Sequence, residues 1–167
     1  MTTHSQQDIE HLISCAKVIC DPPRKEMRVE RGSRRNDMRL RSQEGDLEFS
    51  VFMRINDDFP ENFSIGLEYR APDERSSICL LRCNGPHGEF VGGPESAHFL
   101  HHIHKAKPGN LEARLKAERG GERTDAYDSY LEALRYFLKV VNVTNADEFF
   151  PNLRQLALNP EWGEPKK

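Results

Sequence analysis

The sequence predicts a single α+β domain in which an antiparallel meander of about five or six strands packs on one face against an N-terminal helix and a C-terminal helical segment. Alternating apolar segments follow one another at short intervals between residues 24 and 105. The tight turns between them are too short for the crossovers that parallel strands require. Helical periodicity is confined to the two ends of the chain, and 167 residues fit one domain spanning 1–167.

Composition excludes several broad classes of protein. Charged residues make up 31% of the chain and the net charge is −3, so we expect no general attraction to nucleic acid or anionic membranes. No apolar run approaches the roughly 18 residues of a membrane-spanning helix, and the N-terminus lacks the layout of a secretory signal. The four cysteines include no Cys-x-x-Cys pair, which favours reduced thiols. We expect a cytoplasmic protein that has no contact with a membrane.

The first expected element is an amphipathic helix over residues 6–19, which ends at the prolines that follow Asp21. Ser5 is its expected N-cap. Apolar residues recur on one helix face at Ile9, Leu12, Ile13, Ala16 and Ile19. The next segment, 24–41, is rich in arginine and is expected to form two short strands joined by a turn at Gly32-Ser33.

Four later segments carry strand patterns: 47–55, 63–69, 77–83 and 98–105. The first two alternate apolar and other residues, whereas 77–83 is a compact apolar run of the kind found in central strands. Cys79 and Cys83 are expected to share one face of that strand as small core residues. A loop rich in glycine and proline, 84–94, precedes the last strand.

The C-terminal third is expected to supply the covering helices. Residues 107–123 are polar and predict a mobile loop, with a short solvated helix over 111–118 as the alternative. An apolar stripe predicts a helix over 124–143 with Thr124 as its cap, and a second short helix is expected over 146–156. Residues 1–4 and 160–167 are expected to be frayed tails.

Five histidines lie between residues 87 and 104, and they are the most unusual feature of the chain. Strand alternation places His98, His102 and His104 on one face, with His101 and Ile103 on the other. His87 belongs to the preceding loop, which can fold back beside the first face. His101 is therefore expected to be structural.

Three interpretations of the histidine face remain open. His87, His102 and His104 can act as general acid and base with Arg82 nearby, because imidazole titrates near neutral pH and needs no cofactor for this role. Alternatively, His98, His102 and His104 can hold one zinc or nickel ion. In the third interpretation they are ordinary solvated side chains of an exposed sheet face.

A resemblance supports the location of this site. The run Leu81–His87, the Gly92-Gly93-Pro94 loop, the His-x-His at 102 and 104 and the closing apolar helix are similar to a family of small bacterial proteins of unknown function. Members of that family share an Asn-Gly-Pro turn, a Gly-Pro loop and a His-x-His strand. The resemblance covers about residues 45–150 and implies the fold and the place of the site, but no activity.

Basic residues suggest a substrate for the acid–base interpretation. Arg39 and Arg41 share one strand face, and Arg54 and Lys105 are further candidates for contacts with phosphate groups. Surface arginines on strands are also common without any such role. The favoured hypothesis is a metal-independent, histidine-dependent phosphodiesterase or ribonuclease of toxin-like type that acts on RNA. The alternatives are a divalent-metal-binding protein and a non-catalytic module that binds a cognate protein partner.

Overall fold

The computed structural model describes residues 3–87 and 99–153. Its strands are β1 (Lys17–Asp21), β2 (Arg28–Glu30), β3 (Ser33–Ser42), β4 (Glu48–Asn56), β5 (Phe63–Tyr69), β6 (Ile78–Asn84), β7 (His102–Lys105) and β8 (Gly121–Arg123). Its helices are α1 (Gln6–Ser14), α2 (Pro108–Glu112), α3 (Tyr130–Val140) and α4 (Ala146–Phe149). The tail predicted at 160–167 lies outside the described residues, as do residues 1–2 of the N-terminal one.

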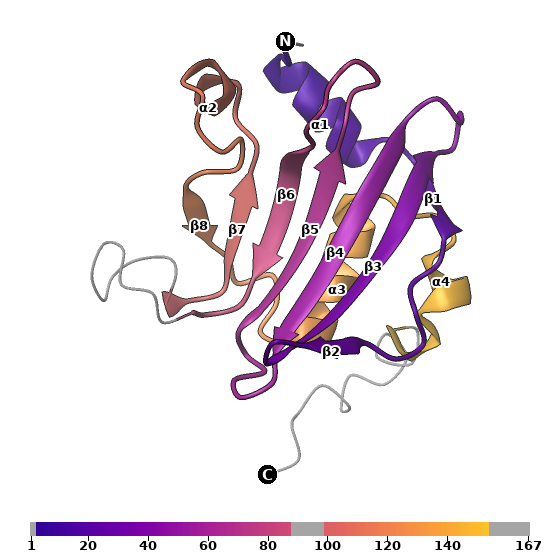
Figure 1. Ribbon diagram of the computed structural model, residues 1–167, viewed down its shortest axis with the longest axis vertical. Coiled ribbons are helices and arrows are strands. Elements are labelled where there is room, and N and C mark those ends of the chain that lie inside the picture. Colours follow the sequence, from indigo (N-terminus) through magenta and orange to yellow (C-terminus); the bar gives the residue numbers. More distant parts are fainter. Residues whose placement is uncertain (1–2, 88–98, 154–167) are drawn as a thin grey trace.

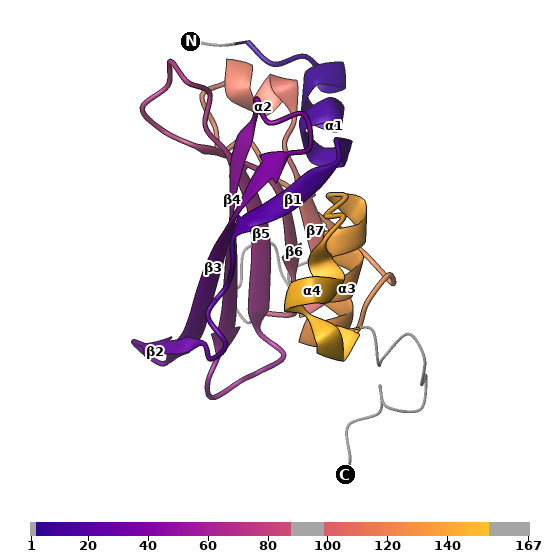
Figure 2. The same ribbon diagram turned by 90° about the vertical axis from the view of Figure 1, so that its right-hand side faces the viewer.

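One antiparallel sheet organises the described part of the chain (Figure 1). Its strand order is β1-β3-β4-β5-β6-β7-β8, and β2 pairs with the far end of β3. Helices α1, α3 and α4 lie on the same side of the sheet (Figure 2), and none of these three covers the opposite side, which is called the open face below. The predicted α+β meander with helices on one face is confirmed. No helix in the described segments is long and apolar enough to cross a membrane.

The face of the sheet that meets the helices carries the hydrophobic core. Strands β4 and β5 each turn alternate apolar side chains to this face, and the facing side of α3 contributes Leu134, Phe137 and Leu138. Ile65 and Leu67 are completely buried there. Full burial of each such side chain stabilises the fold by roughly 1.5–3 kcal/mol. The opposite, open face is therefore free to carry polar residues.

The first predicted helix is too long. Helix α1 ends at Ser14, where Cys15 takes an extended ψ of 143°, and Lys17–Asp21 pairs with β3 as an additional strand. Val18 and Ile19 are β-branched, and their apolar run suits a strand as well as a helix. Asn145 covers the outer edge of β1, because its side-chain amide accepts from the Ile19 N–H at 2.8 Å and donates to the Ile19 carbonyl at 3.3 Å.

The new strand places a lysine inside the core. Lys17 is completely buried, and its ammonium donates hydrogen bonds to the carbonyls of Ile13 at 2.8 Å, Cys15 at 2.9 Å and Val141 at 2.9 Å. It also lies 4.8 Å from the centre of the Phe49 ring. These carbonyls lie at the C-terminal ends of α1 and α3, where a cation is favoured. Burial lowers the pKa of Lys17.

The C-terminal helices are shorter than predicted. Helix α3 begins at Tyr130 because the Ser129 hydroxyl accepts from the Glu132 N–H at 3.2 Å, whereas Thr124 only closes a turn by accepting from Ala126. The helix expected over 146–156 is interrupted at Phe150, and the proline that follows disfavours a helical conformation there. Its end beyond residue 153 lies outside the described residues.

Residues 107–123 contain a helix and a strand, so the predicted loop is corrected. Asn110 ties the segment together, since its amide donates to the carbonyls of Ala117 at 2.9 Å and Arg119 at 3.0 Å. The chain then returns as β8, which pairs with β7. With β1 and β8 added, the sheet has eight strands instead of about six.

The predicted strands at 24–41, 47–55, 63–69 and 77–83 are present, with one change of register. The β2–β3 turn uses positive φ angles at Arg31 (50°) and Gly32 (76°), as hairpin turns of this kind require.

In β6 a bulge at Leu80 places Cys79 opposite Glu68 and Cys83 opposite Ile65. The two cysteines therefore occupy opposite faces of the sheet, and only Cys83 is a core residue. The last predicted strand, 98–105, is reduced to β7, and residue 98 lies outside the described residues.

Candidate functional site

Two rows of residues cross the open face of the sheet, each linked by strand pairing. One row contains Arg54, Ser64, Asn84, His102 and Arg123. The neighbouring row contains Phe52, Gly66, Arg82, His104 and Gly121. Strands β4 to β8 thus bring together side chains that are far apart in the sequence, and the two histidines lie where β6, β7 and β8 meet.

Backbone carbonyls fix the tautomer of both neutral imidazoles. The Nδ1 atom of His102 lies 2.7 Å from the Leu100 carbonyl oxygen, and that of His104 lies 3.1 Å from the Glu118 carbonyl oxygen. Because a carbonyl can only accept, each Nδ1 must carry the hydrogen of the bond. In its neutral form each ring therefore keeps a lone pair on Nε2, the state required of a base or a metal ligand.

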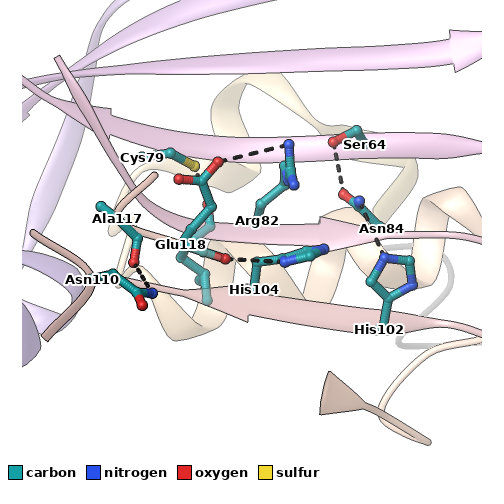
Figure 3. A network of polar contacts seen from close by, with 10 residues as sticks. Ser64, Cys79, Arg82, Asn84, His102, His104, Asn110, Ala117 and Glu118 are labelled. Carbon is teal, nitrogen blue, oxygen red and sulfur yellow. Dashed lines mark hydrogen bonds and ion pairs between the residues drawn. The ribbon is translucent and has the colours of Figure 1, made fainter. Parts of the chain in front are cut away.

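A hydrogen-bonded chain fixes the position of the His102 ring (Figure 3). The Ser64 hydroxyl lies 2.8 Å from Asn84 Oδ1, and Asn84 Nδ2 lies 3.4 Å from His102 Nε2. Since the hydroxyl donates to Oδ1, the amide nitrogen is directed at the Nε2 lone pair, in agreement with the tautomer deduced from Leu100. All of these side chains are buried, which favours one fixed arrangement.

Three of the predicted histidines are in ring contact. The centroids of His87 and His102 are 5.1 Å apart, and those of His102 and His104 are 4.9 Å apart. His102 is completely buried and His104 is 3% exposed, whereas His87 is half-buried. The prediction that His87 folds back beside His102 agrees with this geometry. His98 lies outside the described residues.

Arg82 is the charged neighbour of the histidine pair. Its guanidinium lies 3.8 Å from a carboxylate oxygen of Glu118, whose backbone carbonyl holds His104 (Figure 3). The thiol of Cys79 lies beside this carboxylate, and burial, followed by the charge of Glu118, raises the pKa of Cys79 to about 12. Burial also raises the pKa of Cys83 to about 12. Both thiols are therefore protonated near neutral pH and are poor nucleophiles.

Two residues that sequence reasoning did not single out help to build the site. A Cβ atom on Gly121 would lie 2.9 Å from His102 Cδ2 and 3.0 Å from His104 Cε1, so β8 closes against both rings only because this residue is glycine. The Tyr127 hydroxyl lies 3.0 Å from the Asn84 carbonyl and 2.8 Å from the His102 carbonyl, which ties β6 to β7. Burial raises the pKa of Tyr127, so the phenol stays neutral. The Gly120-Gly121 pair is the sequence feature that could have indicated the close approach of β8, and no pattern indicated the role of Tyr127.

The remaining predicted residues divide between the two faces. His101 lies on the helix side, with its ring 5.7 Å from that of Tyr127 and 6.2 Å from that of Phe63. Lys105 follows His104 along β7 and also turns away from the open face. Arg39, Arg41 and Arg54 lie on the open face. Arg39 lines a groove of about 640 Å³ together with Arg70, Arg75, Glu48, Glu68 and several serines.

The described segments contain two of the three predicted metal ligands, His102 and His104. Within 3–87 and 99–153, no group of three or more histidine, cysteine, aspartate or glutamate side chains is arranged to hold a metal ion. Two imidazoles with oriented Nε2 atoms are present, and the third predicted ligand, His98, is not described.

Comparison of the chain with models of known protein families, with curated proteins and with solved structures gives no match.

Proposed function

We propose that this protein cleaves single-stranded RNA without a metal ion, by histidine acid–base catalysis at the open sheet face. The observation that carries the proposal is the contact series of His87, His102 and His104 beside Arg82. Imidazoles in fixed tautomers next to a guanidinium are the groups that such a reaction uses.

The reaction transfers one proton at each end of the breaking linkage. One imidazole removes the proton of the ribose 2′-hydroxyl, and the 2′-oxygen forms a bond to phosphorus. The bond between phosphorus and the 5′-oxygen breaks, and a protonated imidazole donates a proton to that leaving oxygen. The products are a 2′,3′-cyclic phosphate and a free 5′-hydroxyl, and no oxidant or metal is consumed.

Burial supports different roles for the histidines. His87 is the imidazole that meets the substrate, because it is half-buried and lines a cavity. His102 contacts the His87 ring and is the second proton-transfer group, once its Nε2 exchanges the 3.4 Å contact with Asn84 Nδ2 for the substrate. His104 is a positioning residue, held by the Glu118 carbonyl. The guanidinium of Arg82 stabilises negative charge that develops on the phosphate oxygens.

The rest of the open face suits a single strand of RNA. The Phe52 ring lies directly over Gly66, where any side chain would displace it, and it offers a surface for a nucleobase. Arg54 and Arg39 lie on the same face and can contact phosphates.

The test is incubation of RNA with purified protein in EDTA. The wild type should cut single-stranded RNA, and His87→Ala and His102→Gln should each reduce the rate by at least about a hundredfold, the usual contribution of one acid–base group. His101→Gln is the matched control, because this neighbouring histidine lies on the helix side, and it should retain activity. Intact RNA across varied sequences, or cutting that survives His87→Ala, would contradict the proposal.

A second candidate is a zinc or nickel site that uses His102 and His104. It is supported by the Nδ1–H bonds to carbonyls, which are the usual outer partners of metal-bound imidazoles. Elemental analysis of protein purified without a histidine tag tests it. Less than about a tenth of an equivalent of metal per chain would exclude a tight site, whereas one equivalent, together with inhibition by EDTA, would replace the first proposal.

A further inference from the structure

A cavity of about 350 Å³ lies beside His87 at the end of the sheet where the β4–β5 turn meets the end of β6. Its described lining consists of Phe59, Glu61, Asn62, Pro86, His87 and Phe99. The volume falls within the range of about 300–1,000 Å³ that small-molecule sites occupy. The same imidazole therefore contacts the buried His102 and borders this cavity.

The turn that presents Phe59 is fixed by hydrogen bonds. The Asn56 side-chain oxygen accepts from the N–H groups of Asp58 at 2.9 Å and Phe59 at 3.0 Å, and the Phe59 carbonyl accepts from Asn62 at 2.8 Å. In spite of this order Phe59 is 62% exposed, so it makes little contribution to the core. An ordered aromatic ring held in water at the rim of a cavity is suited to stack on a planar ligand.

The polar lining indicates which planar ligand fits. The side chains of Glu61 and Asn62 make no hydrogen bond or ion pair within the described segments, so both remain available to a ligand. A carboxylate accepts hydrogen bonds and donates none. Among the four RNA bases, guanine alone offers two adjacent donors, N1–H and the N2 amino group, to a single carboxylate.

We infer that this cavity binds a guanine base of the RNA next to the bond that is cut. The inference rests on the proposed cleavage of RNA and adds its sequence preference. Phe59 stacks on the base, the Glu61 carboxylate accepts from N1–H and N2–H, and the Asn62 amide donates to O6. The base then leaves its ribose and 3′-phosphate beside His87, where the 2′-hydroxyl is to be deprotonated.

Binding of mononucleotides tests the inference without any cleavage. Isothermal titration of the wild-type protein should give a dissociation constant for guanosine 3′-monophosphate at least about tenfold lower than for the adenosine, cytidine and uridine 3′-monophosphates. Glu61→Gln should remove this preference, because a neutral amide keeps only one acceptor oxygen and turns its NH2 group toward one of the two guanine donors. Phe59→Ala should weaken binding of guanosine 3′-monophosphate by about tenfold, the scale of one stacking contact.

Val29→Ala is the matched control for Phe59→Ala, because Val29 is 71% exposed on β2, is not among the residues that line the cavity, and should leave binding unchanged. Equal affinity for the four nucleotides, or a guanine preference that survives Glu61→Gln, overturns the inference. RNA cleavage without nucleotide selectivity would leave the proposed function intact, whereas selective guanine binding without cleavage would overturn the function and retain the site.

Discussion

Two buried polar centres lie at different places in the fold, and they have opposite surroundings. Lys17 lies between the sheet and the helices, and its ammonium meets one carbonyl for each of its three hydrogens. His102 and His104 are buried on the other face, where their Nδ1 atoms are held by carbonyls and their Nε2 atoms keep lone pairs. The three hydrogens of the lysine are all donated to carbonyls, whereas the Nε2 atom of an imidazole can exchange a proton.

Comparison of the two centres separates structural from functional polar residues in this chain. Burial alone does not distinguish them, because Lys17 and His102 are both 0% exposed. The distinguishing property is the chemistry of the group itself. All three hydrogens of the Lys17 ammonium are donated to carbonyls, so Lys17 stabilises the fold. An imidazole can both accept and donate a proton, so the histidine pair is the candidate for chemistry.

The largest expected effect is on stability, at the lysine centre. Lys17→Met leaves three buried carbonyls without their donor, so the free energy of unfolding should fall by about 3 kcal/mol or more. Urea denaturation followed by circular dichroism measures this change. Lys139→Met, at an exposed position in the last turn of α3, is the control and should change stability little. A Lys17 variant as stable as the wild type would mean that the centre is dispensable.

Gly121→Ala should affect the histidine centre more than the fold. The added methyl group would press on both imidazoles, at 2.9 Å from His102 and 3.0 Å from His104, so we expect RNA cleavage to fall at least about tenfold. The stability cost of such overpacking is about 1–3 kcal/mol. Gly109→Ala is the control, because nothing lies within 4 Å of its added methyl group. Full activity in Gly121→Ala would show that the ring positions are not critical.

Alkaline pH should change the stability through two buried core groups, Cys83 and Lys17, in opposite directions. Burial raises the pKa of Cys83 from 9.0 to about 12, so the folded state keeps a proton that the unfolded state loses. The resulting stability is present below pH 9 and is lost as the pH rises toward 12, at up to about 1.4 kcal/mol per pH unit for each such group. The lowered pKa of Lys17 acts in the opposite direction, because there the unfolded state keeps its proton longer.

Denaturation midpoints measured between pH 8 and 11 test this dependence. The free energy of unfolding should decline over that range, and Cys83→Ala should make the decline shallower. Lys17→Met should make it steeper, because the opposing contribution is removed. An unchanged slope in Cys83→Ala would contradict the assignment.

The smallest expected effect concerns the orientation of one amide. Ser64→Ala removes the hydroxyl that holds Asn84 Oδ1 at 2.8 Å, a bond worth about 1 kcal/mol. We expect a several-fold lower kcat with little change in KM, since Asn84 positions His102 and does not bind RNA. Ser50→Ala, a serine on the same open face in β4, should leave both constants unchanged. A change confined to KM would place Ser64 in the binding surface instead.

The parts of the fold that depend on local pattern were predictable. Alternation in β4 and β5 follows directly from one buried and one open face, and the same rule placed His102 and His104 together and His101 apart. Lys17–Asp21 was misassigned because a short apolar run fits a helix and a strand equally well. The bulge at Leu80 has no local signal, and it reversed the face of Cys79.

The components of the site that were missed depend on contacts between distant segments. Tyr127 belongs to an apolar stripe, and only the structure directs its hydroxyl at two carbonyls of β6 and β7. Gly121 contributes by having no side chain, which no periodicity reveals. Glu118 and its carbonyl reach His104 only because α2 returns the chain to the sheet as β8.

The edge position of β8 predicts that the protein loses its activity before it unfolds. This strand of three residues is at the end of the sheet, and it alone presses Gly121 against both imidazoles. Edge segments with few partners open at a lower free energy than central strands. Heating or mild urea should therefore release the histidine rings while β4 and β5 remain paired, so that inactivation precedes unfolding. Amide hydrogen exchange faster at Glu122 than at Ile65, with activity lost below the denaturation midpoint, would be the signature of this local opening of β8.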